Sequence, residues 1–208
     1  MAESWFTYLQ SQICKEFELF ENGRKKFVKR DWNKNNNEGG GTSFLLSGGN
    51  IFEKVGVNKS TVSGKFKKEF RHKILGAHKN GKYWASGISV VAHMKNPKIP
   101  AIHFNTRFIV TTKEWFGGGM DVTPSHIDMK ERKLVHSMLK KVCSQNKKNY
   151  KKYKNWCDKY FYLPHRKESR GIGGIFFDYK KNNWEKDFAF IRDVGLTFNV
   201  IFNSIIKN

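Results

Sequence analysis

Hydrophobic residues recur at every third or fourth position in several stretches of the chain, which is the spacing of a helix with one apolar face. The longest of these runs covers residues 5–20, where Ser4 is placed to cap the helix, and a second long run covers residues 190–205. Shorter runs predict helices over about 134–143 and 150–162, and Ser125-His126-Ile127-Asp128 matches a capping box before the first of them. The chain therefore has amphipathic helices at both ends and in its second half.

β-branched and aromatic residues instead dominate residues 83–92 and 101–110, which predicts two strands. The segment between them contains Pro97 and Pro100, so it predicts a stiff loop that joins neighbouring strands. The polar, glycine-rich stretch at 33–41 predicts a loop. Short apolar runs predict further strands at 44–46, from 51 onward and at 175–177.

The order of these elements indicates the fold class. Strands that are grouped together, with helices between them but without a regular strand-helix-strand alternation, are typical of the α+β class with an antiparallel sheet. A chain of 208 residues that is 38% hydrophobic is long enough to bury one substantial core. We therefore expect a single domain over residues 1–208.

Positive charge is in large excess along the chain. It contains 39 Lys and Arg against 18 Asp and Glu, a formal charge of +21 that attracts anions of any kind, from nucleic acid to an acidic metabolite. A lysine-rich and aromatic segment at 147–162 keeps a nucleic-acid-binding protein open as an alternative. The same run is also typical of a solvated helix face.

Cysteine usage and the N-terminus indicate where such a protein would be found. Cys14, Cys143 and Cys157 form no C-x-x-C pair, so they indicate neither a disulfide framework nor a thiolate metal site. The N-terminus lacks a basic segment followed by an apolar run, and no stretch reaches the ~18 continuous apolar residues of a membrane span. We expect a cytoplasmic protein without a membrane span.

The strand over 101–110 carries a distinctive polar face. Alternation places His103, Asn105 and Arg107 on the same side, and Ser89 and His93 join them if the two strands pair. A half-buried sheet commonly has a solvated polar face, yet this one contains no Lys or Glu in a lysine-rich chain. Arginine binds carboxylates through two parallel hydrogen bonds, and histidine moves protons near neutral pH. The segment therefore predicts one wall of an enzyme site for a small carboxylate-bearing substrate.

Three further polar residues are candidates for a site, each with an ordinary alternative. Asp121 follows three glycines, which let backbone approach a ligand, and an aspartate among apolar groups is suited to proton transfer. The alternative is an aspartate that only forms a turn. His136 is typical of a histidine at the edge of a core, and His165 lies in a segment typical of a loop.

Four long stretches of the chain resemble the oxygen-dependent coproporphyrinogen III oxidase family. They are GGGTSFLLSGGNIFEKVGVNKSTVSG at 39–64, ISVVAHMKNPKIPAIHFNTRF at 88–108, WFGGGMDVTP at 115–124 and YKKYKNWCDKYFYLPHRKESRGIGGIFFDY at 150–179. These stretches follow the family's order and cover nearly the whole chain.

The resemblance implies both a fold and a reaction. The fold is a large antiparallel β-sheet flanked by α-helices on both sides, in a homodimer. The reaction is the oxidative decarboxylation of coproporphyrinogen III to protoporphyrinogen IX in haem biosynthesis, in which two propionates become vinyl groups. Molecular oxygen is the co-substrate, and no organic cofactor is implied. A divalent metal cation is also associated with the family.

The resemblance also assigns roles by motif. It implies that Ser89, Asn105, Thr106 and Arg107 bind the substrate. His103 corresponds to a proton donor, and Asp121 corresponds to a catalytic aspartate. The histidines that correspond to metal ligands are His93, His103, His136 and His165.

Members of this family continue beyond the position of Asn208, through a strand-rich segment with a further substrate contact and much of the dimer interface. The resemblance therefore predicts a chain that lacks the C-terminal segment. It also predicts that the last helix exposes Phe198, Ile201, Phe202 and Ile205. An inactive remnant that binds porphyrinogen or a partner chain is the alternative to an active enzyme.

Overall fold

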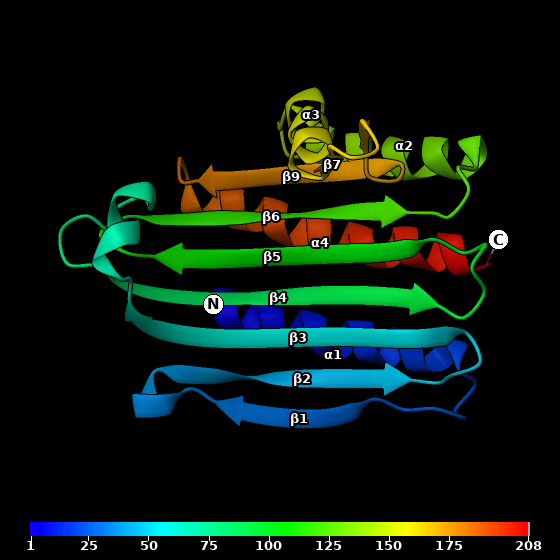
Figure 1. Cartoon of the computed structure of the whole chain (residues 1–208), viewed down its shortest axis with the longest axis horizontal. Coiled ribbons are helices and arrows are strands. Elements are labelled where there is room, and N and C mark those ends of the chain that lie inside the picture. Colours follow the sequence, from blue (N-terminus) through cyan, green and yellow to red (C-terminus); the bar gives the residue numbers. More distant parts are fainter. Residues whose placement is uncertain (208) are drawn as a thin grey trace.

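Seven strands form one antiparallel sheet, in the spatial order β1-β2-β3-β4-β5-β6-β9 (Figure 1). The computed structural model describes residues 1–207. The strands are β1 (Val28–Asn33), β2 (Gly39–Ser47), β3 (Phe52–Lys65), β4 (Lys82–Met94), β5 (Ala101–Val110), β6 (Glu114–Thr123) and β9 (Gly173–Lys180). A separate hairpin pairs β7 (Tyr162–Leu163) with β8 (Glu168–Ser169). The predicted antiparallel sheet is confirmed, including the pairing of the two strands around Pro97 and Pro100.

Four α-helices pack around this sheet. They are α1 (Ala2–Phe20), α2 (Met129–Gln145), α3 (Tyr150–Tyr160) and α4 (Trp184–Lys207), with short 3-10 turns at Asn35–Asn37 and Lys68–Lys73. Helices α1 and α4 lie side by side behind the sheet in Figure 1, with α1 against β3 and β4 and α4 against β5 and β6. Helix α3 packs against β9. Its Tyr160 ring stacks on Phe176 on the face of the sheet opposite to α1 and α4. The α+β fold with helices on both sides of the sheet is confirmed.

The core lies between the sheet and the helices α1 and α4. Phe17 of α1 stacks on Phe52 of β3 and on Phe202 of α4, with ring centroids 5.3 and 3.9 Å apart. Burying aromatic rings of this size contributes strongly to stability. The expectation that α4 exposes its apolar residues is wrong, because α1 and the sheet cover Phe198, Phe202 and their apolar neighbours.

Helix α4 is also long and apolar enough, by length and composition alone, to cross a membrane. Half of its most apolar window is buried inside this fold, where it packs on α1, α2 and the sheet. A core helix passes the same length and hydropathy test as a membrane span, so the packing accounts for its composition.

Two strands contain glycine-rich segments, one of which the sequence predicted as part of a loop. Strand β2 begins at Gly39 inside the predicted glycine-rich loop, and β6 contains Gly117, Gly118 and Gly119. In β6, a Cβ at position 118 would lie 2.5 Å from the backbone oxygen of Asn105, and one at 119 would lie 2.4 Å from that of Ile175. The neighbouring strands approach so closely that these positions require glycine, although glycine is typical of loops.

The start of α2 also differs from its predicted capping box. The box would place Ser125 as the cap, but the helix begins at Met129 with Asp128 as its N-cap. The Asp128 carboxylate accepts hydrogen bonds from the backbone N–H groups of Lys130 and Glu131, at 2.6 and 3.3 Å. An aspartate at this position satisfies donors that the first turn leaves unpaired.

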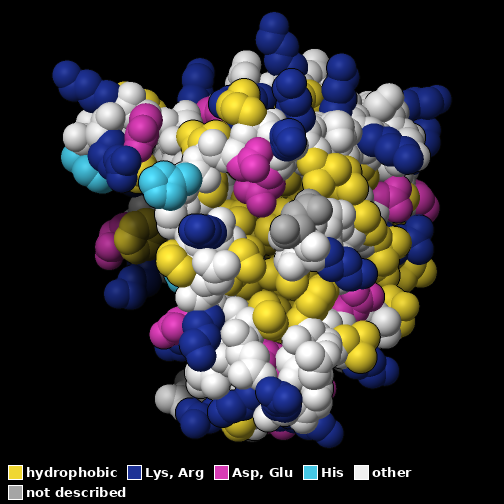
Figure 2. All heavy atoms as spheres, turned by 90° about the vertical axis from the view of Figure 1, so that its right-hand side faces the viewer, with side chains coloured by type: hydrophobic (Ala, Val, Ile, Leu, Met, Phe, Trp, Pro, Cys, Tyr) yellow, Lys and Arg dark blue, Asp and Glu magenta, His cyan; other side chains and the backbone are white. Residues whose placement is uncertain are grey.

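Positive charge is dispersed over the side of the molecule where α1 and α4 end. Figure 2 shows Lys and Arg side chains scattered around an apolar area on this side. Leu19, Phe20 and Val200 line a shallow groove there. Nucleic-acid binding needs basic residues gathered in a patch or stripe. This side of the molecule has no such stripe among the described residues, so it does not favour the nucleic-acid alternative.

Candidate functional site

The face of the sheet opposite α1 and α4 carries the polar residues that strand alternation predicted. We call it the open face. On β4 and β5 the side chains of Ile88, Val90, Ile102 and Phe104 are buried toward the helices. The intervening side chains point the other way and include Ser89, His93, His103, Asn105 and Arg107. The register pairs Ser89 with Asn105 and Asn105 with Gly119, so these positions share one surface.

Asp121 is the centre of a charged cluster on the open face. Residue 121 lies directly opposite His103 in the β5–β6 pair, and it is only 1% exposed. Arg170, just after β8, donates hydrogen bonds of 2.9 Å from Nη2 to both carboxylate oxygens and one of 3.2 Å from Nε to Oδ2. The His103 ring nitrogen Nδ1 lies 3.4 Å from Oδ2. Asp121 is therefore an ion-paired carboxylate within a strand, rather than a turn residue or an acid among apolar groups.

The donors around Asp121 are distributed unequally over its two oxygens. Oδ2 faces Arg170, His103 and the Thr123 hydroxyl, which donates at 3.1 Å, whereas among residues 1–207 Oδ1 accepts only from Arg170. An ionised carboxylate oxygen accepts about two hydrogen bonds. Oδ1 therefore keeps the capacity to accept one more N–H or O–H donor.

Aromatic rings and the cluster enclose a small hollow, which we call the inner hollow. Its volume is about 180 Å³. The Arg170 guanidinium lies 3.9 Å from the centre of the Phe161 ring, a cation–π contact that fixes its position. The lining residues are Ser89, Val90, Val91, His103, Phe104, Asn105, Gly119, Met120, Asp121, Phe161, Arg170 and Phe176. The site thus combines a carboxylate, an imidazole and a guanidinium with apolar walls.

Arg107 lies beside this hollow and is itself paired. Its Nη2 donates to Asp178 of β9 at 2.7 Å, and its Nη1 donates to Asn105 at 3.2 Å. The Trp115 indole also donates to Asp178, at 3.1 Å. A Cβ at position 117 would lie 2.3 Å from Asp178, so only glycine leaves room for this pair. The Arg107 side chain is therefore held across the open face instead of extending into solvent.

The structure corrects the prediction for Thr106. Its side chain points toward the helices, is 1% exposed, and its hydroxyl has no hydrogen-bond partner among the described residues. The reason is strand alternation, because a residue between Asn105 and Arg107 must face the opposite side of the sheet. The Thr106 side chain therefore does not line the open face with its two neighbours.

The four histidines predicted as metal ligands do not come together as one ligand set. His93 and His103 are neighbours, with ring centroids 5.9 Å apart. His136 uses both ring nitrogens elsewhere, since Nε2 donates to the Ile172 carbonyl at 2.7 Å and Nδ1 accepts from the Tyr150 hydroxyl at 2.8 Å. His165 is exposed in the turn between β7 and β8. Residues 1–207 contain no group of three or more metal-ligating side chains. This arrangement does not fit the metal prediction.

Acid is expected to destabilise the fold through His136. Burial lowers the pKa of His136, and this effect outweighs the hydrogen bond to the Ile172 carbonyl, which by itself would raise the pKa. Below about pH 6.5 the unfolded chain therefore binds more protons at His136 than the folded chain does. The contribution of the neutral His136 ring to the free energy of unfolding is complete above this pH and is lost as the pH falls further. The loss is at most about 1.4 kcal/mol per pH unit for one group.

Urea unfolding at pH 7.5 and 5.5 measures this loss. The His136→Gln variant should lose less of its unfolding free energy between the two pH values than wild type does. The exposed histidine His126 provides a matched control, because His126→Gln should keep the wild-type pH dependence. Equal pH dependence in wild type and His136→Gln would contradict the assigned environment.

Sequence reasoning missed Arg170, Asp178 and Phe161 as site residues. Arg170 belongs to a segment that is typical of a loop, and Asp178 is 71 residues from its partner Arg107. Their pairing depends on β9 lying next to β6, which no local pattern shows. One signal was available in the sequence. Asp121 and Asp178 lie in apolar strand segments, where a carboxylate needs a cationic partner, and the chain has a charge of +21.

Known proteins match this chain along its whole length. The family model described as "Coproporphyrinogen III oxidase" matches residues 1–208. A protein from Rickettsia rickettsii (strain Sheila Smith) described as "Oxygen-dependent coproporphyrinogen-III oxidase" is 50% identical over the whole chain. Proteins of the same description from Rickettsia conorii (strain ATCC VR-613 / Malish 7) and Rickettsia bellii (strain OSU 85-389) are 49% and 47% identical. The chain spans 77% of the length of each of these relatives.

Proposed function

Because this chain belongs to the coproporphyrinogen III oxidase family, we propose that the cluster of Asp121, His103 and Arg170 is where its reaction takes place. The activity of the family is oxygen-dependent oxidation of coproporphyrinogen III in haem biosynthesis. The observation that carries the proposal is the nearly buried Asp121 carboxylate, held between His103 and Arg170 at the floor of the inner hollow.

The proposed role of Asp121 is to accept a hydrogen bond from the substrate. A porphyrinogen presents four pyrrole N–H donors, and Oδ1 of Asp121 can accept one more donor. A negative charge beside the macrocycle makes the pyrroles easier to oxidise, since it stabilises the positive charge that develops when electrons leave. Arg170 and Thr123 hold the carboxylate in place for this contact.

The proposed role of His103 is to move a proton. Its Nδ1 faces Asp121, which favours the tautomer with the proton on Nδ1 and leaves Nε2 to exchange protons with the substrate. His103 lines the inner hollow and is one quarter exposed, so a ligand in the hollow can reach it. A base oriented by a carboxylate is a common arrangement for proton transfer.

The position of His103 suits the proton transfer that the reaction requires. Conversion of one propionate breaks a C–H bond at the carbon attached to the pyrrole and the bond to the carboxylate carbon. The products are a vinyl group and carbon dioxide. The substrate loses one proton and two electrons in this step. Molecular oxygen takes up the two electrons, this proton and one proton from solvent, which forms hydrogen peroxide. His103 is placed to transfer the substrate-derived proton.

Substrate binding is proposed for Ser89, Asn105 and Arg107. Ser89 and Asn105 are paired across β4 and β5 and line the inner hollow, where both can hydrogen-bond a ligand. Arg107 lies next to them, and its planar guanidinium suits a propionate carboxylate. A homodimer and a cytoplasmic location, both expected from the sequence, belong to the same proposal, and gel filtration of the purified chain tests the dimer.

Replacing His103 with glutamine tests the proton role. Loss of general acid–base catalysis should lower kcat by about 100- to 10,000-fold while coproporphyrin III still binds. The matched control is His72→Gln, a histidine on the turn before Ile74 that lies outside the inner hollow. A kcat for His103→Gln within threefold of wild type would sink the assignment.

A further inference from the structure

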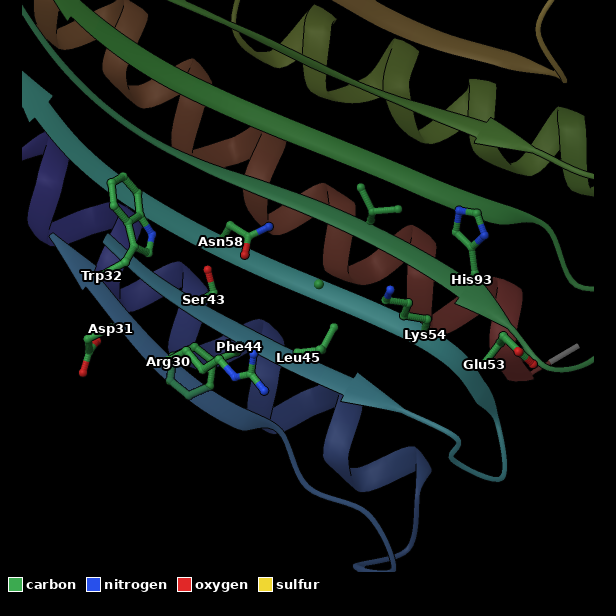
Figure 3. Close-up of a pocket in the computed structure, with 12 residues that line it drawn as sticks. Arg30, Asp31, Trp32, Ser43, Phe44, Leu45, Glu53, Lys54, Asn58 and His93 are labelled. Atoms are coloured by element: carbon green, nitrogen blue, oxygen red, sulfur yellow. The ribbon is translucent and has the colours of Figure 1, made fainter. Parts of the chain in front are cut away.

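A second and larger hollow lies on the open face, next to the inner hollow. We call it the outer hollow, and its volume is about 830 Å³. Strands β1 to β4 line it, with Leu45, Val91 and Trp32 as its apolar part (Figure 3). Val91 borders both hollows, so the two are adjacent along the same surface. A ligand larger than the inner hollow can therefore extend over both.

A row of polar side chains leads from the edge of the sheet to the proposed reaction site. The register pairs Arg30 with Ser43, Ser43 with Asn58, Asn58 with Ser89, and Ser89 with Asn105. Neighbouring strands lie about 4.8 Å apart, so the row spans about 19 Å from β1 to β5. A tetrapyrrole with extended propionates has comparable width. The row therefore offers hydrogen-bonding groups along the whole length of such a ligand.

The cations of the two hollows differ in their partners. Arg170 of the inner hollow is paired with Asp121, and Arg107 beside that hollow is paired with Asp178. Arg30 and Lys54 both line the outer hollow, are exposed, and form no ion pair within residues 1–207. Each of them can therefore bind a new carboxylate without giving up an existing ion pair.

Two carboxylates and a histidine also line the outer hollow. Asp31 is paired with Lys29 at 2.9 Å and accepts from Thr42 at 2.7 Å. Glu53 is an exposed carboxylate at the rim, next to Lys54 in the chain, and His93 is the remaining titratable group. In Figure 3 the Arg30 and Lys54 side chains come from β1 and β3 and reach the same hollow.

We propose that Arg30 and Lys54 form a carboxylate-binding subsite that holds the propionates which do not react. This inference rests on the proposed function, because it takes a tetracarboxylate as the ligand. With the far side of the macrocycle held in the outer hollow, a reacting propionate lies over His103 and Asp121. Arg30 and Lys54 are then positioning residues, and they contribute to binding rather than to the chemical step.

Charge-removing variants test the subsite. Arg30→Met and Lys54→Met should each raise KM for coproporphyrinogen III about three- to tenfold, the size of one partly exposed charge-assisted contact, and leave kcat nearly unchanged. The Kd for coproporphyrin III, followed by porphyrin fluorescence, should rise by the same factor. Both effects should shrink as salt is raised. The matched control is Lys65→Met on the same strand β3, outside the outer hollow, which should change neither constant.

Filling the hollow gives a test that does not depend on charge. A Cβ at Gly56 meets only the Asn58 amide, at 3.6 Å, so Gly56→Val fits the strand and occupies space above it. This variant should also weaken binding of coproporphyrin III. Wild-type constants in Gly56→Val and in the Arg30→Met/Lys54→Met double variant would overturn the subsite. If wild type does not turn over coproporphyrinogen III, the proposed function fails, and the coproporphyrin III Kd values still decide the subsite.

Discussion

Replacing Asp121 with asparagine is expected to lower turnover of coproporphyrinogen III by about 100- to 10,000-fold, the range for loss of a group that acts in proton transfer or charge stabilisation. The amide keeps the shape of the side chain but removes the negative charge that Arg170 and His103 face. It also presents a donor where Oδ1 or Oδ2 accepts. The measurement is kcat and KM by discontinuous assay, with protoporphyrin detected after oxidation of the product.

The effect should lie in kcat far more than in binding. Coproporphyrin III should bind the Asp121→Asn variant within a few-fold of wild type, since the outer hollow and Arg107 are unchanged. Asp128→Asn is the matched control, because asparagine also caps helices and Asp128 is exposed outside both hollows. A variant with wild-type kcat would show that Asp121 is only a structural partner of Arg170.

Replacing Phe202 with alanine is expected to reduce the free energy of unfolding by about 3–5 kcal/mol. Phe202 is fully buried, and its ring contacts Phe17, Phe20, Phe52 and Phe198 from α1, β3 and α4. The cavity left by alanine would lie where the two long helices meet the sheet. Urea unfolding monitored by circular dichroism gives the free energy.

The control for this variant lies on the same helix. Val200 is 53% exposed, so Val200→Ala should change the unfolding free energy by less than about 1 kcal/mol. If Phe202→Ala and Val200→Ala destabilise the protein equally, α4 does not pack on α1 and the sheet as described. The pair therefore tests whether the last helix belongs to the core.

The sequence predicted one face of the site well because strand alternation is a local rule. His103, Asn105 and Arg107 had to share a face whatever the partner strands were, and the same rule places Thr106 on the other side. The motif resemblance, which treated Asn105, Thr106 and Arg107 as one unit, carried no information on which way each side chain points.

The sequence could not predict the partners of these residues. Gly117, Gly118 and Gly119 are typical of a loop, and only the close approach of β5 and β9 makes them necessary in a strand. Once β6 is a strand, Asp121 falls opposite His103, and β9 brings Asp178 to Arg107. These contacts join segments far apart in the chain, which local propensity and periodicity do not report.

If the open face of this sheet carries out the oxygen-dependent oxidation, the purified chain must make product only when oxygen is present. Purified chain is incubated with coproporphyrinogen III in air and under argon, and the products are oxidised and separated by chromatography. We expect protoporphyrin in air, with two equivalents each of carbon dioxide and hydrogen peroxide, and no protoporphyrin under argon. Coproporphyrin alone in both samples, from protein whose unfolding is cooperative, would contradict it.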